Sequence, residues 1–252
     1  MKNYYAIFAA CAAAVLSSCG TQIQMTEAIP AKVCLGRGTT VYIGSPYKDY
    51  GLERALTNKI LSDGYYTLPG YSNASNSSVA HLSIRNIETG IYAGMHYLAA
   101  DAHVYRHGSM VYNKGYVGTA SQDPQSGKIY YDNASKSIAN SVMNDLTPHE
   151  KNFYVRVKGN SKNPDIERGA LACRAGNWAQ GEVYARQAIN INPQDAEAYF
   201  LLGVIERNKM NYNKSTQYFQ KAYALKPHGK YQTAISKNRV MQQNDQYVQQ
   251  QL

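Results

Sequence analysis

The sequence lacks the long apolar runs and the short motifs that mark channels and common enzymes. Beyond its N-terminal region, no apolar stretch approaches the roughly 20 residues that a membrane-spanning helix needs. Gly-x-Ser-x-Gly, His-Glu-x-x-His and a phosphate-binding glycine loop are all missing. These absences argue against a channel, a serine hydrolase, a zinc protease and a nucleotide-binding enzyme, and the sequence indicates no cofactor.

Metal-ligating and acidic side chains are few and scattered. The two histidines closest in sequence, His103 and His107, flank a predicted turn, and no cysteine or carboxylate stands at a matching ligand spacing. The aspartates that could form a paired-carboxylate site are Asp101, Asp123, Asp132 and Asp145. Each is explained as a residue of a strand face, a turn or a helix end. We therefore expect surface histidines, no metal site and no enzyme, with an unrecognised hydrolase site as the alternative.

The N-terminal region differs from the rest of the chain. Lys2 precedes an apolar run that ends in Leu16-Ser17-Ser18-Cys19. A basic start, a short apolar run and small residues before a break are typical of a secretory signal peptide. Leu16-Ser17-Ser18-Cys19 resembles the lipobox of bacterial lipoproteins, which implies removal of residues 1–18 and a lipid on Cys19. The alternatives are an ordinary cleaved signal peptide and an apolar N-terminus that ends in cysteine by chance.

The same resemblance implies a location. Lipoproteins of this kind carry three acyl chains on the first cysteine, enough for stable membrane anchoring. Gly20 stands where many lipoproteins retained at the inner membrane have aspartate. We therefore expect an outer-membrane lipoprotein facing the periplasm, with the inner membrane and the cell surface as alternatives.

Cysteine usage leaves two thiols in the exported chain. Cys11 leaves with the signal peptide and Cys19 carries the lipid, so Cys34 and Cys173 remain in a compartment where disulfides persist. They form a disulfide under one interpretation. Under the other, each is a small buried apolar residue.

The charge balance is basic but diffuse. Lysine and arginine number 26 against 17 aspartates and glutamates, and no polybasic arm occurs. This excess suits anionic envelope polymers or lipid headgroups, or is an ordinary solvated surface. Nucleic acid is not an expected partner outside the cytoplasm. The 23 tyrosines suit either a protein interface or half-exposed strands.

The first half of the exported chain predicts an α+β domain at residues 32–158, after a tether at residues 19–31. Apolar residues at three- and four-residue spacing predict a helix over Gly51–Asp63 and another ending near Leu146. Alternating or β-rich segments predict strands at Val41–Gly44, Tyr65–Leu68, Ala80–Arg85, Ala100–Tyr105, Met110–Thr119 and Phe153–Val157. We expect an antiparallel sheet packed with two helices. This order of elements resembles the α/β domains of envelope-assembly lipoproteins.

The second half is periodic. Pro193 and Pro227 lie 34 residues apart, and Gly169 recurs as Gly203 at the same spacing. The segment from Tyr199 to Pro227 resembles a tetratricopeptide repeat (TPR), with Arg168, Gly181, Ser215 and Glu206 as departures from the family pattern. The resemblance implies two helical hairpins at residues 162–227, followed by a capping helix and a Gln-rich tail at residues 228–252. Gly159 to Pro164 is the expected linker.

The TPR resemblance also implies a peptide-binding groove on the first helix of each hairpin. Carried over by position, its residues are Glu197, Phe200, Val204, Arg207, Asn208, Ala170, Cys173 and Arg174. An apolar floor between charged ends suits an extended or helical peptide. The alternative is that some of these residues pack against the rest of the chain.

Together these features predict a lipid-anchored envelope adaptor that binds another envelope protein through its TPR groove, in assembly, secretion or cell-wall synthesis. Two repeats and a cap bury their apolar faces incompletely, which implies docking onto the first domain or self-association. An envelope glycan-binding or peptidoglycan-binding lipoprotein is the alternative.

Overall fold

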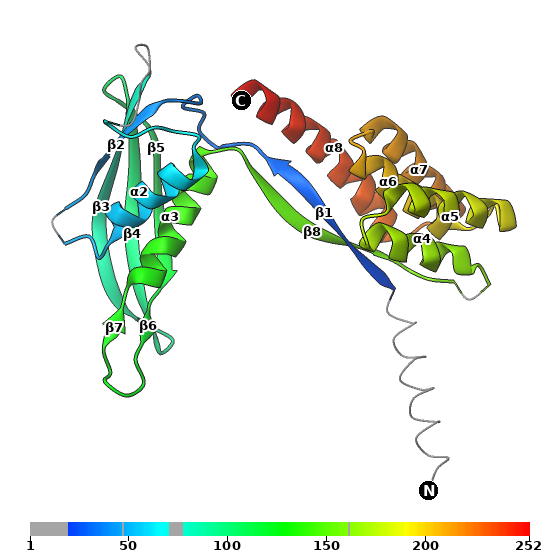
Figure 1. Cartoon of the computed structure of the whole chain (residues 1–252), viewed down its shortest axis with the longest axis horizontal. Helices are drawn as coiled ribbons and strands as arrows, with labels where there is room; N and C mark the ends of the chain where they lie inside the picture. Colours follow the sequence, from blue (N-terminus) through cyan, green and yellow to red (C-terminus); the bar gives the residue numbers. More distant parts are fainter. Residues whose placement is uncertain (1–19, 47, 71–77, 161) are drawn as a thin grey trace, which may run out of the picture. The chain divides into compact units, whose positions relative to one another are not determined.

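The computed structural model describes residues 20–46, 48–70, 78–160 and 162–252, so the predicted signal peptide and Cys19 lie outside the described residues. The described chain forms two compact units (Figure 1). The helical unit combines Gly20–Ala28 with Glu150–Gln246, and the sheet unit combines Ile29–His149 with Tyr247–Leu252. The main segment of the sheet unit therefore spans Ile29–His149, whereas the sequence predicts an α+β domain at residues 32–158.

The sheet unit is built on a four-stranded sheet. Its strands are β2 (Thr40–Gly44), β3 (Val79–Tyr92), β4 (Met95–Arg106) and β5 (Ser109–Thr119), in the spatial order β2-β3-β4-β5. β2 runs parallel to β3, and the other neighbours are antiparallel. The sheet is therefore mixed, not wholly antiparallel as expected, because the chain passes through a helix between β2 and β3.

Two helices cover one face of this sheet, as the apolar spacing predicts. They are α2 (Leu52–Asp63) and α3 (Asp132–Leu146), and their buried stripes join the inward residues of β3 and β4 in one core (Figure 1). α3 lies close to β5 because Gly118 has no side chain, and a Cβ there would overlap the backbone of Ala134. The other sheet face carries polar and aromatic side chains.

The connections differ from the prediction in detail. The β4–β5 hairpin turns through His107 and Gly108, which have φ of 50° and 76°, as a two-residue hairpin turn requires. The predicted strand Tyr65–Leu68 is an irregular segment with one bridge, from Thr67 to Thr40. A short hairpin of β6 (Ser121–Gln122) and β7 (Ile129–Tyr130) follows β5.

Two helical hairpins with a 34-residue period make up most of the helical unit. They are α4 (Pro164–Arg174) with α5 (Trp178–Ile191), and α6 (Ala196–Asn208) with α7 (Tyr212–Leu225). The turns repeat as well: the Asn177 N–H donates to the Ala172 carbonyl, and the Asn211 N–H to the Glu206 carbonyl, both at 2.9 Å. α8 (Gly229–Gln251) follows, and its last residues belong to the sheet unit.

Small residues set the spacing inside each hairpin. A Cβ on Gly203 would overlap the ring of Phe219, and one on Gly181 would overlap the Cys173 sulfur. At the place of Gly181 in the second hairpin, the Ser215 hydroxyl donates to the Gly203 carbonyl at 2.7 Å. Gly181 and Ser215 stand where the TPR pattern has alanine, and each has a structural reason. At Gly181 the Cys173 sulfur leaves no room for a methyl group, and at Ser215 the hydroxyl makes a buried hydrogen bond.

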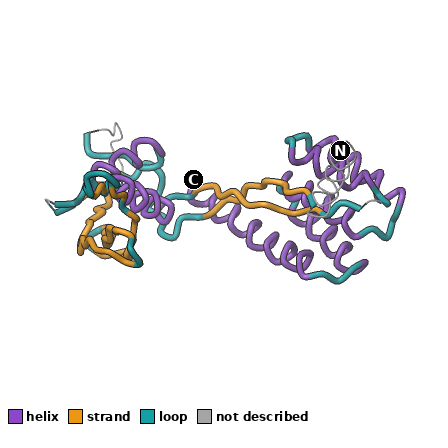
Figure 2. The backbone as a smooth tube through the Cα atoms, turned by 90° about the horizontal axis from the view of Figure 1, so that it is seen from below, coloured by secondary structure: helices purple, strands orange, loops and turns teal. Residues whose placement is uncertain are grey.

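The expected tether is a strand. β1 (Thr21–Ile29) pairs with β8 (His149–Val157), and the two form a separate ribbon beside the helices (Figures 1 and 2). Gly20 lies against Val157 and Thr26 bonds to Asn152, so the strands run antiparallel. The predicted closing strand Phe153–Val157 therefore belongs mainly to the helical unit and not to the four-stranded sheet. Most of its inward side chains, and those of β1, find apolar partners on the helices.

We predict that Gly181→Ala lowers the free energy of unfolding by about 1–3 kcal/mol, because the added methyl group meets the Cys173 sulfur. In a Cys173→Ala background the same substitution should cost much less, since the overlapping atom is gone. Urea denaturation of the two single variants and the double variant measures this coupling. Gln187→Ala, at an exposed site of the same helix, is the control. Equal effects in both backgrounds would contradict the packing described here.

Candidate functional site

The structure divides the predicted groove into a closed middle and two open ends. Ala170, Phe200 and Val204 are buried in the core of the helical unit, as are Cys173 and Arg207 at one end. The ribbon supplies Ile23, Met25 and Val157 to this same core. The predicted apolar floor is therefore covered by the chain's own strands, because β1 and β8 bring an apolar face to it.

Arg207 is an internal residue, which corrects its predicted role as a partner contact. It is 2% exposed and donates to the Asn238 side-chain oxygen at 2.8 Å and to the Ala234 carbonyl at 2.5 Å. Its guanidinium also lies 4.7 Å from the centre of the Phe219 ring. Burial lowers the pKa of Arg207 to about 10. Arg207 therefore joins α6 to α8.

One open end of the groove forms a cleft of about 530 Å³, which we call the Trp178 cleft. It lies where α4 and α6 end, beside β1. The cleft is lined by Gln24, Met25, Thr26, Ala28, Glu150, Cys173, Arg174, Gly176, Trp178, Arg207, Asn208, Met210, Tyr212 and Asp245. Four of the predicted groove residues line this cleft together: Cys173, Arg174, Arg207 and Asn208.

The Trp178 cleft combines apolar surface with opposite charges. Met210 is 69% exposed, Trp178 is half-buried and Arg174 is exposed. The Asp245 carboxylate accepts a hydrogen bond from Tyr212, and burial and this bond raise the pKa of that tyrosine. A neutral tyrosine bonded to a carboxylate holds its proton, so the cleft suits binding better than proton transfer. Trp178 and Met210 were not among the predicted groove residues, because the carried-over repeat positions lie only on the first helix of each hairpin.

The other open end surrounds Glu197. Two cavities lie here, of about 510 and 400 Å³. Both are lined by Glu197, Lys158, Lys226 and Tyr231, and we call them together the Glu197 cleft. The Glu197 carboxylate accepts the Lys158 N–H at 3.1 Å and the Tyr231 hydroxyl at 2.7 Å. Lys230 pairs with it at 2.5 Å. A carboxylate with these three partners holds the ribbon and α8 on α6 and is not a free base.

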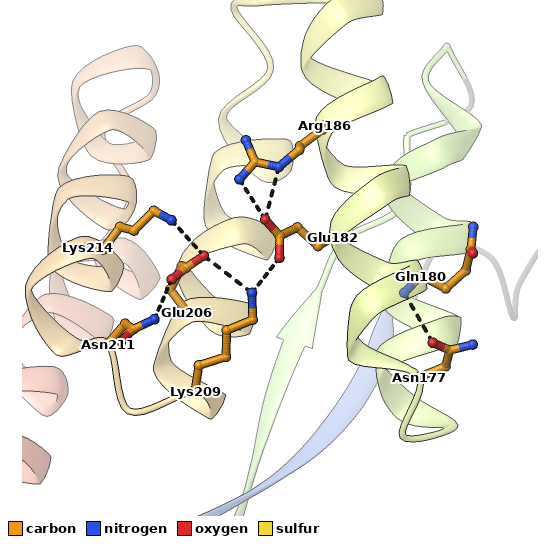
Figure 3. Close-up of polar contacts among 8 residues, drawn as sticks. All are labelled: Asn177, Gln180, Glu182, Arg186, Glu206, Lys209, Asn211 and Lys214. Carbon is orange, nitrogen blue, oxygen red and sulfur yellow. Dashed lines mark hydrogen bonds and ion pairs between the residues drawn. The ribbon is translucent and has the colours of Figure 1, made fainter.

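A charged network joins the two helical hairpins (Figure 3). Lys209 pairs with Glu182 of α5 and with Glu206 of its own helix, the latter at 3.6 Å. Lys214 of α7 also pairs with Glu206, at 3.1 Å. Glu206 is 1% exposed, and it stands where the TPR pattern has tyrosine. Glu206 therefore fixes α6 to the start of α7 within the second hairpin, and Lys209 carries the link to Glu182 of the first hairpin.

A second polar cluster lies in the sheet unit around Asp145. Its carboxylate accepts the hydroxyls of Tyr112 and Tyr116 at 2.7 and 2.9 Å. Lys114 pairs with it at 2.7 Å and Lys32 at 2.5 Å. Burial acts to raise the pKa of Asp145, but these lysine and tyrosine bonds hold it well below its ordinary value. The ionised group locks the end of α3 to β5 and has no remaining capacity to act as an acid.

The other residues weighed for chemistry lie apart. Asp123 accepts two backbone N–H groups in its own turn, and Asp132 pairs with Arg54. In the described chain, no group of three or more histidine, cysteine or acidic side chains is placed to hold a metal ion. Cys34 is exposed in the sheet unit, and Cys173 is buried in the helical unit.

Within the described ranges, none of the helices is both long and apolar enough to cross a membrane. No protein-family model matches the chain, and no curated protein matches it.

Solved structures match parts of the chain. A minor lipoprotein from Acinetobacter baumannii is 14% identical with a TM-score of 0.31, over 44% of this chain and 96% of the other. The PelC dodecamer from Paraburkholderia phytofirmans is 16% identical with a TM-score of 0.29, over 51% and 98%. The rare lipoprotein B from Shewanella oneidensis is 10% identical with a TM-score of 0.18, over 60% and 96%. Likenesses at these values assign neither a family nor a function.

We predict that acid destabilises the helical unit through its charged network. Bonds from Lys209 and Arg186 lower the pKa of Glu182. For Glu206, burial acts to raise the pKa, but bonds from Asn211 and Lys214 outweigh it and the pKa is lowered. A carboxylate with a lowered folded-state pKa stabilises the fold above its unfolded-state pKa of about 4.3, and this contribution is lost as pH falls.

Urea denaturation from about pH 7 to pH 3 measures this loss. Glu182→Gln should be less stable than the parent at neutral pH and should lose less stability on acidification. Glu167→Gln, an exposed carboxylate outside the network, serves as the control and should follow the parent. An unchanged pH profile in Glu182→Gln would contradict the assigned network.

Proposed function

We propose that this protein is a lipid-anchored adaptor of the bacterial envelope, which holds a segment of another envelope protein in the Trp178 cleft. The lipobox-like Leu16-Ser17-Ser18-Cys19 supports the anchor, and the paired helical hairpins with a 34-residue period support a TPR-type binding unit. The observation that carries the binding site is the Trp178 cleft, which combines exposed apolar side chains with charge at one open end of the groove.

The position of the cleft explains why a partner binds at this end. The middle of the groove already holds the chain's own ribbon, so a partner segment has no apolar floor to enter there. At the Trp178 cleft, Trp178 and Met210 offer apolar contact beside Arg174. An aromatic residue and an arginine together are typical of residues that dominate protein interfaces. The partner is therefore a segment with an apolar side chain and a neighbouring carboxylate.

Photocrosslinking in intact cells tests the cleft. We expect a photoreactive residue at Asn208 to give one dominant protein adduct, because Asn208 is exposed and lines the cleft. Arg174→Glu in the same chain should lower the adduct yield about fivefold or more, the effect of losing over 1 kcal/mol at an interface. Arg239→Glu makes the same charge change at an exposed site outside the cleft and should leave the yield unchanged. Equal losses in both variants would contradict the proposed site.

Processing of the precursor tests the anchor. We expect Cys19→Ala to accumulate at precursor size and to lose incorporation of labelled fatty acid, because the acylated thiol is absent. The parent and a Cys34→Ala variant should both be processed and labelled. A Cys19→Ala chain of normal mature size that still partitions into detergent would overturn the assignment.

We propose glycan binding as the second candidate function, on one observation in the sheet unit. The rings of Tyr42 and His81 stack with centres 5.2 Å apart, and they line a cavity of about 450 Å³ with Arg85 and Tyr105. Stacked aromatic rings beside an arginine suit a sugar ring. If this candidate is correct, Tyr42→Ala abolishes sedimentation with isolated cell-wall glycan and leaves the Asn208 adduct unchanged.

A further inference from the structure

A basic cluster lies at the point where the chain leaves its N-terminal segment. A Cβ on Gly20 would lie 2.7 Å from the Val157 carbonyl, 3.1 Å from Arg156 Cγ and 3.3 Å from Lys158 Cα. Gly20 has φ of 72°, a conformation that favours glycine. The first described residue is therefore fixed directly against the last residues of β8.

The cluster continues onto α8 and the turn before it. Arg156, Lys158, Lys226, His228 and Lys230 together line the 400 Å³ cavity of the Glu197 cleft. All of them except Lys230 are exposed. Among the described residues, Arg156, Lys158 and Lys226 form no ion pair, whereas Glu197 is already paired with Lys230. Three cationic side chains thus share one face without a counter-ion.

We propose that this basic face docks on anionic lipid headgroups at the membrane surface and so orients the helical unit. The inference rests on the proposed anchor at Cys19, which is one residue and about 3.8 Å of chain before Gly20. Because Gly20 packs against Arg156 and Lys158, these two cations lie near the anchor, and headgroup charge acts over a Debye length of about 8 Å. Phosphate groups supply the negative charge that the cluster lacks.

The orientation has a consequence for the Trp178 cleft. Glu197 lies in the first turn of α6, whereas Arg207 and Asn208 lie in its last turn. A helix of 13 residues is about 20 Å long. With the basic face on the membrane, the Trp178 cleft therefore points away from the bilayer and stays open to a partner.

Vesicle sedimentation of the whole mature chain, residues 19–252 with Cys19→Ser, tests the docking without the lipid. We expect binding to phosphatidylethanolamine vesicles that contain phosphatidylglycerol, weak binding to phosphatidylethanolamine alone, and loss of binding at high salt. The double variant Lys158→Gln with Lys226→Gln should bind about 30-fold more weakly, since each cation near an anionic surface contributes about 1 kcal/mol.

The matched control is Lys151→Gln with Lys221→Gln, which removes the same charge from exposed sites of the helical unit outside the cavity. It should bind like the parent, and all chains should unfold at the same temperature. Equal weakening in both double variants would overturn the proposal in favour of net charge. Binding to soluble polyphosphate without binding to vesicles would overturn it in favour of an anionic polymer. Failure of the anchor is detected separately, by the processing of the precursor.

Discussion

The helical unit depends on covering the apolar face that α4 and α6 present together. Two hairpins cannot bury such a face by themselves. The ribbon of β1 and β8 covers it with Ile23, Met25 and Val157, while Tyr231 of α8 packs on Phe200 with ring centres 5.3 Å apart. Polar links fix the arrangement: Lys237 of α8 pairs with Glu27 of β1 at 3.0 Å. β1, which lies close in sequence to the predicted lipid site at Cys19, is thus part of the core of the helical unit.

Because the ribbon covers the middle of the groove, only the two ends of the groove are open to a ligand in the described part of the chain. The covered middle leaves the Trp178 cleft and the Glu197 cleft at the two ends of α6. The first has apolar side chains with mixed charge, and the second has an excess of cations. In the proposed account these are the partner side and the membrane side of one small unit.

Much of the local structure could be predicted from the sequence, and most of the long-range pairing could not. The stripes of α2 and α3 and the 34-residue period each lie within one segment, so their spacing is visible directly. β1 was missed even though Thr21, Ile23 and Met25 alternate with polar residues, because its partner strand is more than 120 residues away. Of the predicted groove residues, Arg174 and Asn208 are exposed and line an open cleft. It misplaced Arg207, because a local repeat pattern does not show that α8 binds this side chain.

Hydrogen exchange of the mature chain tests most directly whether β1 fills the groove of the helical unit. The account predicts that the amides of residues 21–28 exchange as slowly as those of residues 150–157, since paired backbone in a buried ribbon opens only with the unit. Phe200→Ala, which removes a large side chain from the shared core, should speed exchange in both strands together. Exchange of residues 21–28 at the rate of an unstructured chain would contradict the account, because a free tether could not cover the apolar face of α4 and α6.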